Sequence, residues 1–306
     1  MMIARNDHRT PGCGPGAPLV VEILTIIVVL FAAAAGTAGA QEAVPGRRAA
    51  GGLVAGANPT ALGVRAELAH VTPLYPERDG ILWDSGQITP SVQVLANPTF
   101  TDVAAQLYVE PVVFFDLTLA GGVRAFYTFA GLGFVPLDSY DAELPSATGD
   151  DFDGEDQVGT FFSVTPQVKF AAGPILGTSS FTATYYRFTG ADSSHMEEPV
   201  TVTAVETTDW VLSSTSRLLY PFGTGAQERL LFAAAGVEYN INWVPAASSD
   251  DQPASHRVSA MGVGVFRLSE ATVFEGAAFL GVYVNGEPIE ATRPYVLTAL
   301  SLVRRF

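Results

Sequence analysis

Cysteine, lysine and histidine are scarce in this sequence, and their scarcity limits the chemistry that the chain can perform. Cys13 is the only cysteine and Lys169 the only lysine. Because Cys13 lies in the leader described below, the mature chain has no disulfide, no thiolate nucleophile and no cysteine for lipid attachment. The 16 basic residues face 31 acidic ones, a balance that excludes a nucleic-acid-binding surface.

Charged residues and long apolar runs are also few. Charged residues make up 15% of the chain, against about 25% in a soluble globular protein. The 48% of hydrophobic residues are too many for an intrinsically disordered chain. After the first forty residues, no apolar run approaches the roughly 20 residues of a transmembrane helix. Two architectures remain, an all-β sandwich and a β-barrel whose apolar face meets lipid.

Residues 1–40 are expected to be a cleaved signal peptide. Arg5 and Arg9 precede an apolar stretch at residues 23–35, and the small-x-small sequence Ala38-Gly39-Ala40 follows. A membrane anchor is the alternative, but the apolar stretch is too short for one. We therefore expect the mature chain to begin at Gln41.

The mature chain divides into two parts by composition. Residues 41–59 are rich in glycine and alanine and predict a flexible periplasmic lead-in. Residues 60–306 are the expected outer-membrane barrel domain.

The dominant pattern of the mature chain is alternation with a period of two. In residues 160–170, Phe162, Val168 and Phe170 share one face, whereas Gln167 and Lys169 share the other. This is typical of a β-strand with two different faces. Residues 229–243 alternate in the same way, and so do residues 105–117, where Glu110-Pro111 is also a candidate turn. Eight noisier segments complete the set: 62–71, 88–96, 123–132, 181–188, 210–220, 258–268, 273–284 and 295–306.

The strand lengths and the connections between them favour the barrel. Several of the eleven expected strands are far longer than the usual 5–6 residues and match the about 9–11 residues of a tilted strand that crosses a bilayer. Short links alternate with long polar ones, as in membrane barrels with short periplasmic turns and long outer loops. The short links are 171–177, 221–227 and 269–270, and the long ones are 136–158, 189–208, 245–256 and 285–293.

An odd strand number conflicts with the even number found in bacterial barrels. Either a weak strand is hidden in residues 51–57 or 110–119, or residues 62–71 lie outside the barrel wall. We predict an all-β, transmembrane, antiparallel up-and-down β-barrel of twelve strands, with ten strands as the alternative.

The segment YVLTALSLVRRF resembles the terminal strand of bacterial outer-membrane β-barrel proteins, which ends in an aromatic residue preceded by apolar residues at alternate positions. Val296, Leu300, Leu302 and Phe306 carry the resemblance, and Arg304 departs from it. The resemblance implies that this strand is the insertion signal read by the barrel-insertion machinery. It also implies an exported protein in contact with the lipids of the outer membrane of a Gram-negative bacterium.

The more polar face of each strand is expected to line the lumen, because a charge that faces lipid at mid-bilayer costs about 2–4 kcal/mol for Arg or Lys. The candidate lumen-lining residues are Arg65, Glu67, Gln93, Gln106, Glu110, Asp116, Arg124, Lys169, Arg217, Glu238, Asn240, Asn242 and Glu275. These residues predict a porin-like or transport-related passage for small polar solutes. The alternative is a closed structural or surface-interaction barrel in which the charges pair and fill the interior.

The long acidic loop is a candidate for loose contacts with divalent cations. Its carboxylates are Asp138, Asp141, Glu143, Asp150, Asp151, Asp153, Glu155 and Asp156. Carboxylates are the ligands that calcium prefers, but the DDFDGED stretch does not have the spacing of a calcium-binding loop. We therefore assign no specific metal site, and we expect no cofactor, because no glycine-rich segment has a phosphate-binding pattern.

A surface-facing barrel enzyme is the third hypothesis. His195 and His256 lie in expected outer loops, near the hydroxyl and carboxyl groups of Ser194, Ser255, Asp192, Asp250 and Asp251. Catalysis would require hydrogen bonds among a nucleophile, a base and an orienting group. Proximity in sequence does not establish such bonds, so no catalytic residue is assigned.

Overall fold

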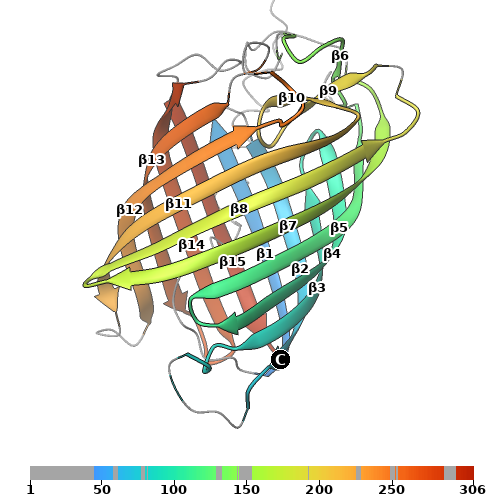
Figure 1. The fold of residues 1–306 in the computed structure, drawn as a ribbon. Helices are drawn as coiled ribbons and strands as arrows, with labels where there is room; N and C mark the ends of the chain where they lie inside the picture. Colours follow the sequence, from blue (N-terminus) through green and yellow to red (C-terminus); the bar gives the residue numbers. More distant parts are fainter. Residues whose placement is uncertain are drawn as a thin grey trace, which may run out of the picture. The chain divides into compact units, whose positions relative to one another are not determined.

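The computed structural model describes residues 45–57, 61–76, 80, 82–128, 133–142, 144, 154–191, 193–224, 229–248, 252, 254–285 and 294–306. The regular structure of these residues consists of strands (Figure 1). Within these ranges, no helix has the length and apolar character required to cross a membrane. The expected signal peptide, residues 1–40, lies outside the described residues.

Twelve antiparallel strands close into a barrel, as predicted, and the alternative of ten strands is wrong. The order around the barrel is β1-β15-β14-β13-β12-β11-β8-β7-β5-β4-β3-β2 (Figure 1). The strands are β1 (Gly46–Ala57), β2 (Ala61–Pro73), β3 (Gln87–Ala96), β4 (Phe100–Val112), β5 (Phe115–Phe126), β7 (Gln157–Ala172), β8 (Ile175–Phe188), β11 (Thr208–Thr224), β12 (Leu230–Trp243), β13 (Ser255–Arg267), β14 (Thr272–Asn285) and β15 (Pro294–Arg305).

β1 is the twelfth strand, the one that was not assigned from the sequence. It lies in residues 41–59, so the prediction of a flexible lead-in there is wrong for residues 46–57. β1 pairs with β2 on one side and with β15 on the other, so it closes the barrel. It includes residues 51–57, one of the two segments in which a hidden strand was expected. Its faces differ little in polarity, because most of its residues are glycine or alanine, and the alternation is therefore weak.

The boundary between β4 and β5 also differs from the prediction. Glu110-Pro111 is not a turn but belongs to β4, and the chain reverses at residues 113–114. The β4–β5 register shifts between Val109 and Val112, which accommodates Pro111, since proline cannot donate a ladder hydrogen bond. The strand expected at residues 123–132 begins earlier and ends at Phe126.

In strands such as β12, the alternation separates an exposed apolar outer face from an inner face with charged and amide side chains. In β12, Val237 and Tyr239 are 50% and 42% exposed, whereas Glu238 and Asn240 between and beyond them are 3% and 6% exposed. Leu68 and Leu280 on other strands are more than 60% exposed. A sandwich would bury such side chains between two sheets, so the closed barrel with its apolar outer face excludes the sandwich.

The two ends of the barrel differ in their connections. We call the end that holds the turns at residues 113–114, 173–174 and 268–271 the short-turn end, and the opposite end the loop end. The predicted alternation of short and long links fails only in the first strands. There the longer link, residues 74–86, lies at the short-turn end, and the short link, residues 97–99, at the loop end.

The links at residues 136–158 and 189–208 were predicted to be long polar loops, but parts of them form a three-stranded sheet at the loop end. The sheet consists of β6 (Pro136–Leu137), β9 (His195–Glu198) and β10 (Thr203–Glu206), in the order β10-β9-β6 (Figure 1). Met196, Val205 and Ala204 are at most 1% exposed. We call this element the inserted sheet, because both of its faces are buried against the barrel.

The two faces of the inserted sheet contact different parts of the inner wall. Met196 and Val205 belong to an aromatic-rich cluster with wall residues such as Phe100, Phe126 and Tyr186. Leu137, Val202 and Ala204 belong to a second cluster, which includes residues of β11 to β15. The inserted sheet therefore lies between two sides of the barrel wall and occupies its interior at the loop end.

Candidate functional site inside the barrel

The structure places all thirteen predicted lumen residues on barrel strands, on the face opposite to the exposed apolar side chains. Six of them are less than 9% exposed: Glu110, Asp116, Arg124, Glu238, Asn240 and Asn242. The interior thus holds many of the charged side chains of the wall. That these residues line a route for solutes stays a prediction.

The first charge cluster surrounds the single lysine. Lys169 Nζ on β7 lies 3.0 Å from Glu110 Oε1 on β4 and 2.9 Å from Asp116 Oδ2 on β5. The Tyr108 hydroxyl donates to Glu110 Oε2 at 2.6 Å, and Gln167 Nε2 donates to Asp116 Oδ2 at 3.1 Å. One cation therefore faces two carboxylates, and neutral donors complete their hydrogen bonding.

Two further clusters have the opposite composition, with one carboxylate between two arginines. Glu238 on β12 accepts from Arg217 Nε at 2.8 Å and from Arg257 Nη2 at 3.2 Å. The Arg257 guanidinium also lies 4.0 Å from the centre of the Tyr295 ring.

Near the first strands, Glu67 on β2 accepts from Arg65 Nη2 at 3.0 Å and from Arg48 Nη2 at 3.3 Å. Each of these two clusters carries one positive charge in excess.

The fourth cluster joins the wall to the inserted sheet. Arg124 on β5 forms a bidentate ion pair with Asp102 on β4, with Nε–Oδ1 and Nη2–Oδ2 distances of 2.7 and 2.8 Å. Its remaining nitrogen, Nη1, donates to Glu198 Oε1 on β9 at 2.7 Å. The Arg124 guanidinium also lies 4.1 Å from the centre of the Phe100 ring. Two carboxylates again face one cation.

Glu198 also organises the turn of the β9–β10 hairpin. Its Oε2 accepts from the backbone nitrogens of Val200 and Thr201 at 3.1 and 2.7 Å, and from the Thr201 hydroxyl at 2.7 Å. The turn ends at Val202, which has a φ of 53°. This left-handed conformation is unfavourable for a β-branched residue, so the contacts of Glu198 and the buried Val202 side chain hold a strained turn.

The other predicted lumen residues lie outside these four clusters. Some form longer hydrogen bonds, and for the rest the strand register or the burial shows the inward position. Gln106 Oε1 accepts from the Ser91 hydroxyl at 3.4 Å, and Asn240 Nδ2 donates to Thr215 Oγ1 at 3.0 Å. Gln93 lies opposite Glu67 in the β2–β3 register, and Glu275 lies opposite Ser301 in the β14–β15 register. Asn242 is buried near the end of β12.

Sequence reasoning missed four charged members of these clusters: Arg48, Asp102, Glu198 and Arg257. Asp102 lies four residues before Gln106, and Arg257 lies four residues before Met261, so each shares the inner face of its strand. Both residues lie just outside the predicted strands, and strands that began earlier would have included them. Arg48 was hidden by the assignment of a flexible lead-in. Glu198 carries no such pattern, because it lies on a four-residue strand within the long connection between two wall strands.

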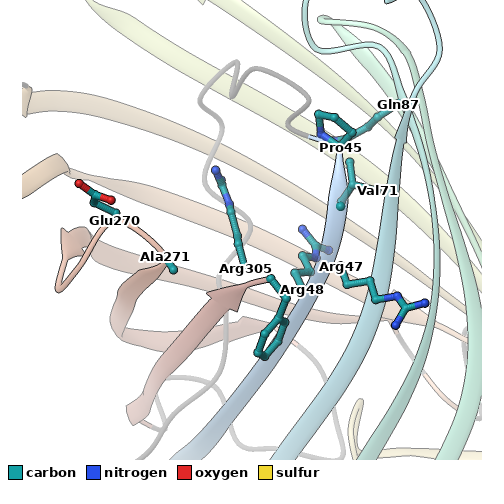
Figure 2. Close-up of a pocket in the computed structure, with 10 residues that line it drawn as sticks. Pro45, Arg47, Arg48, Val71, Gln87, Glu270, Ala271 and Arg305 are labelled. Carbon is teal, nitrogen blue, oxygen red and sulfur yellow. The ribbon is translucent and has the colours of Figure 1, made fainter.

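A pocket of about 350 Å³ opens at the short-turn end (Figure 2). Its lining includes Arg48 near the start of β1, Arg305 at the end of β15, Gln87 at the start of β3, and Glu270 in the β13–β14 turn. Arg48 and Arg305 are direct partners in the β1–β15 register. The pocket therefore lies beside the seam that closes the barrel.

Comparison with known proteins gives only distant likenesses. No family model and no curated protein matches the chain. Among solved structures, the CymD monoaromatic hydrocarbon channel matches with a TM-score of 0.39 and 10% identity over 86% of this chain and 89% of that chain. The NanC porin matches with a TM-score of 0.36 and 6% identity over 85% and 99%, and OmpT of Vibrio cholerae with 0.32 and 6% over 85% and 95%.

At these scores the likenesses say nothing about the solutes of this chain. Its structural class follows instead from the closed barrel and the apolar outer face of that barrel. The architecture is that of an outer-membrane β-barrel. In its terminal strand, Val296, Leu302 and Phe306 are 41%, 39% and 71% exposed, and Leu300 lies on the same outer face. Their role as an insertion signal stays a prediction.

The histidines of the enzyme hypothesis lie in different surroundings. Ser194 Oγ and His195 Nδ1 are 2.9 Å apart, and the Tyr140 ring packs edge-on against His195. His195 Nε2 is buried without a hydrogen-bond partner among the described residues, so no orienting group is placed there. His256 Nδ1 contacts the Tyr239 hydroxyl. Asp192, Asp250 and Asp251 lie outside the described residues, while Ser255 is buried at the start of β13.

The acidic loop is described only in part. Asp138 and Asp141 are exposed, and Asp156 Oδ1 accepts from the Thr128 backbone nitrogen at 2.6 Å. Across the described residues, no three His, Cys, Asp or Glu side chains are grouped as a metal site would require. Glu143, Asp150, Asp151 and Asp153 lie outside the described residues, so loose cation binding stays a prediction.

Proposed function

We propose that this chain is an outer-membrane channel for small polar solutes whose outer end is closed, in this conformation, by the inserted sheet. The short-turn end faces the periplasm and the loop end faces outward, as is usual for such barrels. The terminal strand is read by the barrel-insertion machinery, and the exposed apolar side chains contact outer-membrane lipids.

The unequal charges of the interior clusters carry the proposal. Two clusters have one cation between two carboxylates, and two have one carboxylate between two cations. Each therefore keeps an excess unit charge. A sealed, dry interior would make such charges costly, and apolar residues would stabilise it better. In three of the clusters the cation is accessible to water, since the side chains of Arg65, Lys169 and Arg217 are 30%, 20% and 27% exposed. The Arg124 cluster is instead buried where the inserted sheet meets the wall.

The alternative, a closed barrel without transport, is favoured by a different observation. The inserted sheet buries apolar side chains on both faces, and Glu198 is 0% exposed. Packing of this quality is also what a permanent closure requires. In that case the remaining surface loops would serve as contact sites for other molecules.

Conductance in planar lipid bilayers separates the two functions. We expect discrete current steps from the purified chain that become more frequent in a variant whose inserted sheet is released, such as Glu198→Ala. If neither the unaltered chain nor that variant conducts above background, the barrel is closed and the channel function is refuted. Correct folding of both proteins is checked beforehand by circular dichroism and by heat-dependent electrophoretic mobility.

A further inference from the structure

The basic residues of the barrel fall into two groups. Those of the interior clusters lie within 4.0 Å of a carboxylate: Arg48, Arg65, Arg124, Lys169, Arg217 and Arg257. In the described part of the chain, the others have no carboxylate within that distance: Arg47, Arg187, Arg229, Arg267, Arg304 and Arg305. Only Arg187, near the end of β8, lies at the loop end.

The unpaired arginines at the short-turn end lie on neighbouring strands. The Arg267 backbone nitrogen at the end of β13 donates to the Arg229 carbonyl at 2.6 Å. On the other side of β14, the Phe306 nitrogen donates to the Arg47 carbonyl at 2.9 Å, which joins the end of β15 to the start of β1. This rim therefore gathers arginines that form no ion pair with the described residues, in a chain whose formal net charge is −15.

Two members of this group, Arg47 and Arg305, line the pocket, and of these two Arg305 lies on the inner face of the wall. It lies on the inner face of β15, two residues beyond Val303, and opposite Arg48 in register. Figure 2 shows Arg47 pointing away from Arg48 and Arg305. Arg304, by contrast, lies on the outer face with Leu302 and stands 5.4 Å from the centre of the Phe306 ring.

The carboxylates near the pocket leave room for another anion. Glu67 is already shared by Arg48 and Arg65. Glu275 lies within electrostatic range of both Arg48 and Arg305 but forms no ion pair with either. Glu270 lines the pocket from the β13–β14 turn and is exposed. No acidic residue of the described chain holds the Arg305 guanidinium.

We propose that this pocket binds a small anion with carboxylate or phosphate groups. A guanidinium group offers two parallel N–H donors that match a carboxylate or phosphate. The volume of about 350 Å³ lies within the usual range for small-molecule sites. Arg305 is the main ligand and Arg48 the second. The Gln87 amide nitrogen, which also donates to Glu110 Oε2 at 3.4 Å, is a neutral donor. That the channel carries anionic solutes extends the proposed channel function and rests on it. Binding of an anion in the pocket does not depend on that function.

Binding is measured by calorimetry on the full barrel in a neutral detergent, with succinate and inorganic phosphate as probes and glucose as a neutral control. We expect both anions to bind at low salt and more weakly as salt rises, and glucose not to bind. Arg305→Gln should weaken anion binding at least tenfold, and the Arg48→Gln, Arg305→Gln double variant should abolish it.

Two matched variants remove the same charge elsewhere. Arg304→Gln changes the outer face of the same rim, and Arg187→Gln changes the opposite end. Both should bind as the unaltered chain does. Equal binding by Arg305→Gln, or binding of short-chain phosphatidylglycerol without binding of either free anion, would overturn the proposal. A barrel that binds succinate through Arg305 but conducts no ions would retain this site and refute the channel function.

Discussion

Arg124 on the barrel wall and Glu198 on the inserted sheet form an ion pair of 2.7 Å in which both side chains are at most 5% exposed. The two residues are 74 positions apart in sequence, so the pair fixes a distant loop to the wall. Removing one member of a buried ion pair costs about 3–5 kcal/mol. The pair is thus the natural place at which to release the inserted sheet.

The first prediction is that Glu198→Ala opens the loop end. The substitution leaves Arg124 paired with Asp102, so the wall itself stays intact. It removes the hydrogen bonds that hold the strained turn at Val202, whose φ of 53° costs about 1–3 kcal/mol. A loss of about 1.4 kcal/mol from the closed state raises the open population about tenfold. We expect at least that increase in open probability in planar bilayers.

Asp138→Ala is the matched control for this experiment. Asp138 is an exposed carboxylate next to β6, so its loss changes the same net charge without touching the ion pair. If Glu198→Ala and Asp138→Ala give the same open probability, Arg124 and Glu198 do not hold the closure.

The second prediction uses the only lysine of the chain as a probe of the lumen. Lys169 lies toward the short-turn end of β7, inside the barrel, and its side chain is 20% exposed. A small amine-reactive ester added to intact cells should label it slowly, because the inserted sheet blocks the outer end. Labelling should be fast in permeabilised cells, and fast in intact cells that carry Glu198→Ala. Peptide mass spectrometry measures the modified fraction, and rapid labelling of the unaltered chain in intact cells would show an open outer end.

Much of the barrel was predictable because its wall strands separate two different media. Val237 lies on the exposed outer face and Glu238 on the inner face, so neighbouring residues differ in polarity and the period of two is visible in the sequence. The same contrast marked Lys169 and Arg217 as inward-facing. β1 was not recognised because its glycine and alanine residues suit both media.

The inserted sheet could not be predicted for a related reason. β9 is only four residues long, and Met196, Glu197 and Glu198 are all buried. An element that is buried on both faces shows no alternation. Glu198 is surrounded by Glu197, Pro199 and Thr201, which is ordinary loop composition. Its partner Arg124 is distant in sequence, and only the closed barrel brings the two together.

The third prediction concerns Tyr140, which lies in the loop after β6 and donates to Asp209 Oδ2 at 2.9 Å. Burial, followed by the hydrogen bond to Asp209, raises the pKa of the Tyr140 hydroxyl above its ordinary value of 10.0. The folded chain therefore keeps this proton at a pH at which the unfolded chain loses it, so the hydroxyl's stabilising effect falls as pH rises above 10.

Tyr140→Phe tests this sign. Near pH 8 the variant should be less stable by about 0.5–1.5 kcal/mol, the usual contribution of one hydrogen bond. Between pH 10 and 11 the difference should shrink, because only the unaltered chain loses stability through this group. Urea midpoints at each pH measure the difference, and a difference that stays constant across this range would contradict the prediction.

The fourth prediction separates close strand contact from the general effect of glycine. A Cβ atom added at Gly236 on β12 would overlap the carbonyl oxygen of Leu218 on β11, whereas one added at Gly262 on β13 would have no atom within 4 Å. Gly236→Ala should therefore destabilise the barrel by about 1–3 kcal/mol, because the backbone must shift. Gly262→Ala should be neutral or stabilise it by up to about 1 kcal/mol, because alanine restricts the unfolded chain. Urea unfolding of both variants measures the contrast. Equal urea midpoints would contradict the prediction. They would mean that β11 and β12 can move apart enough to accommodate the added methyl group at Gly236.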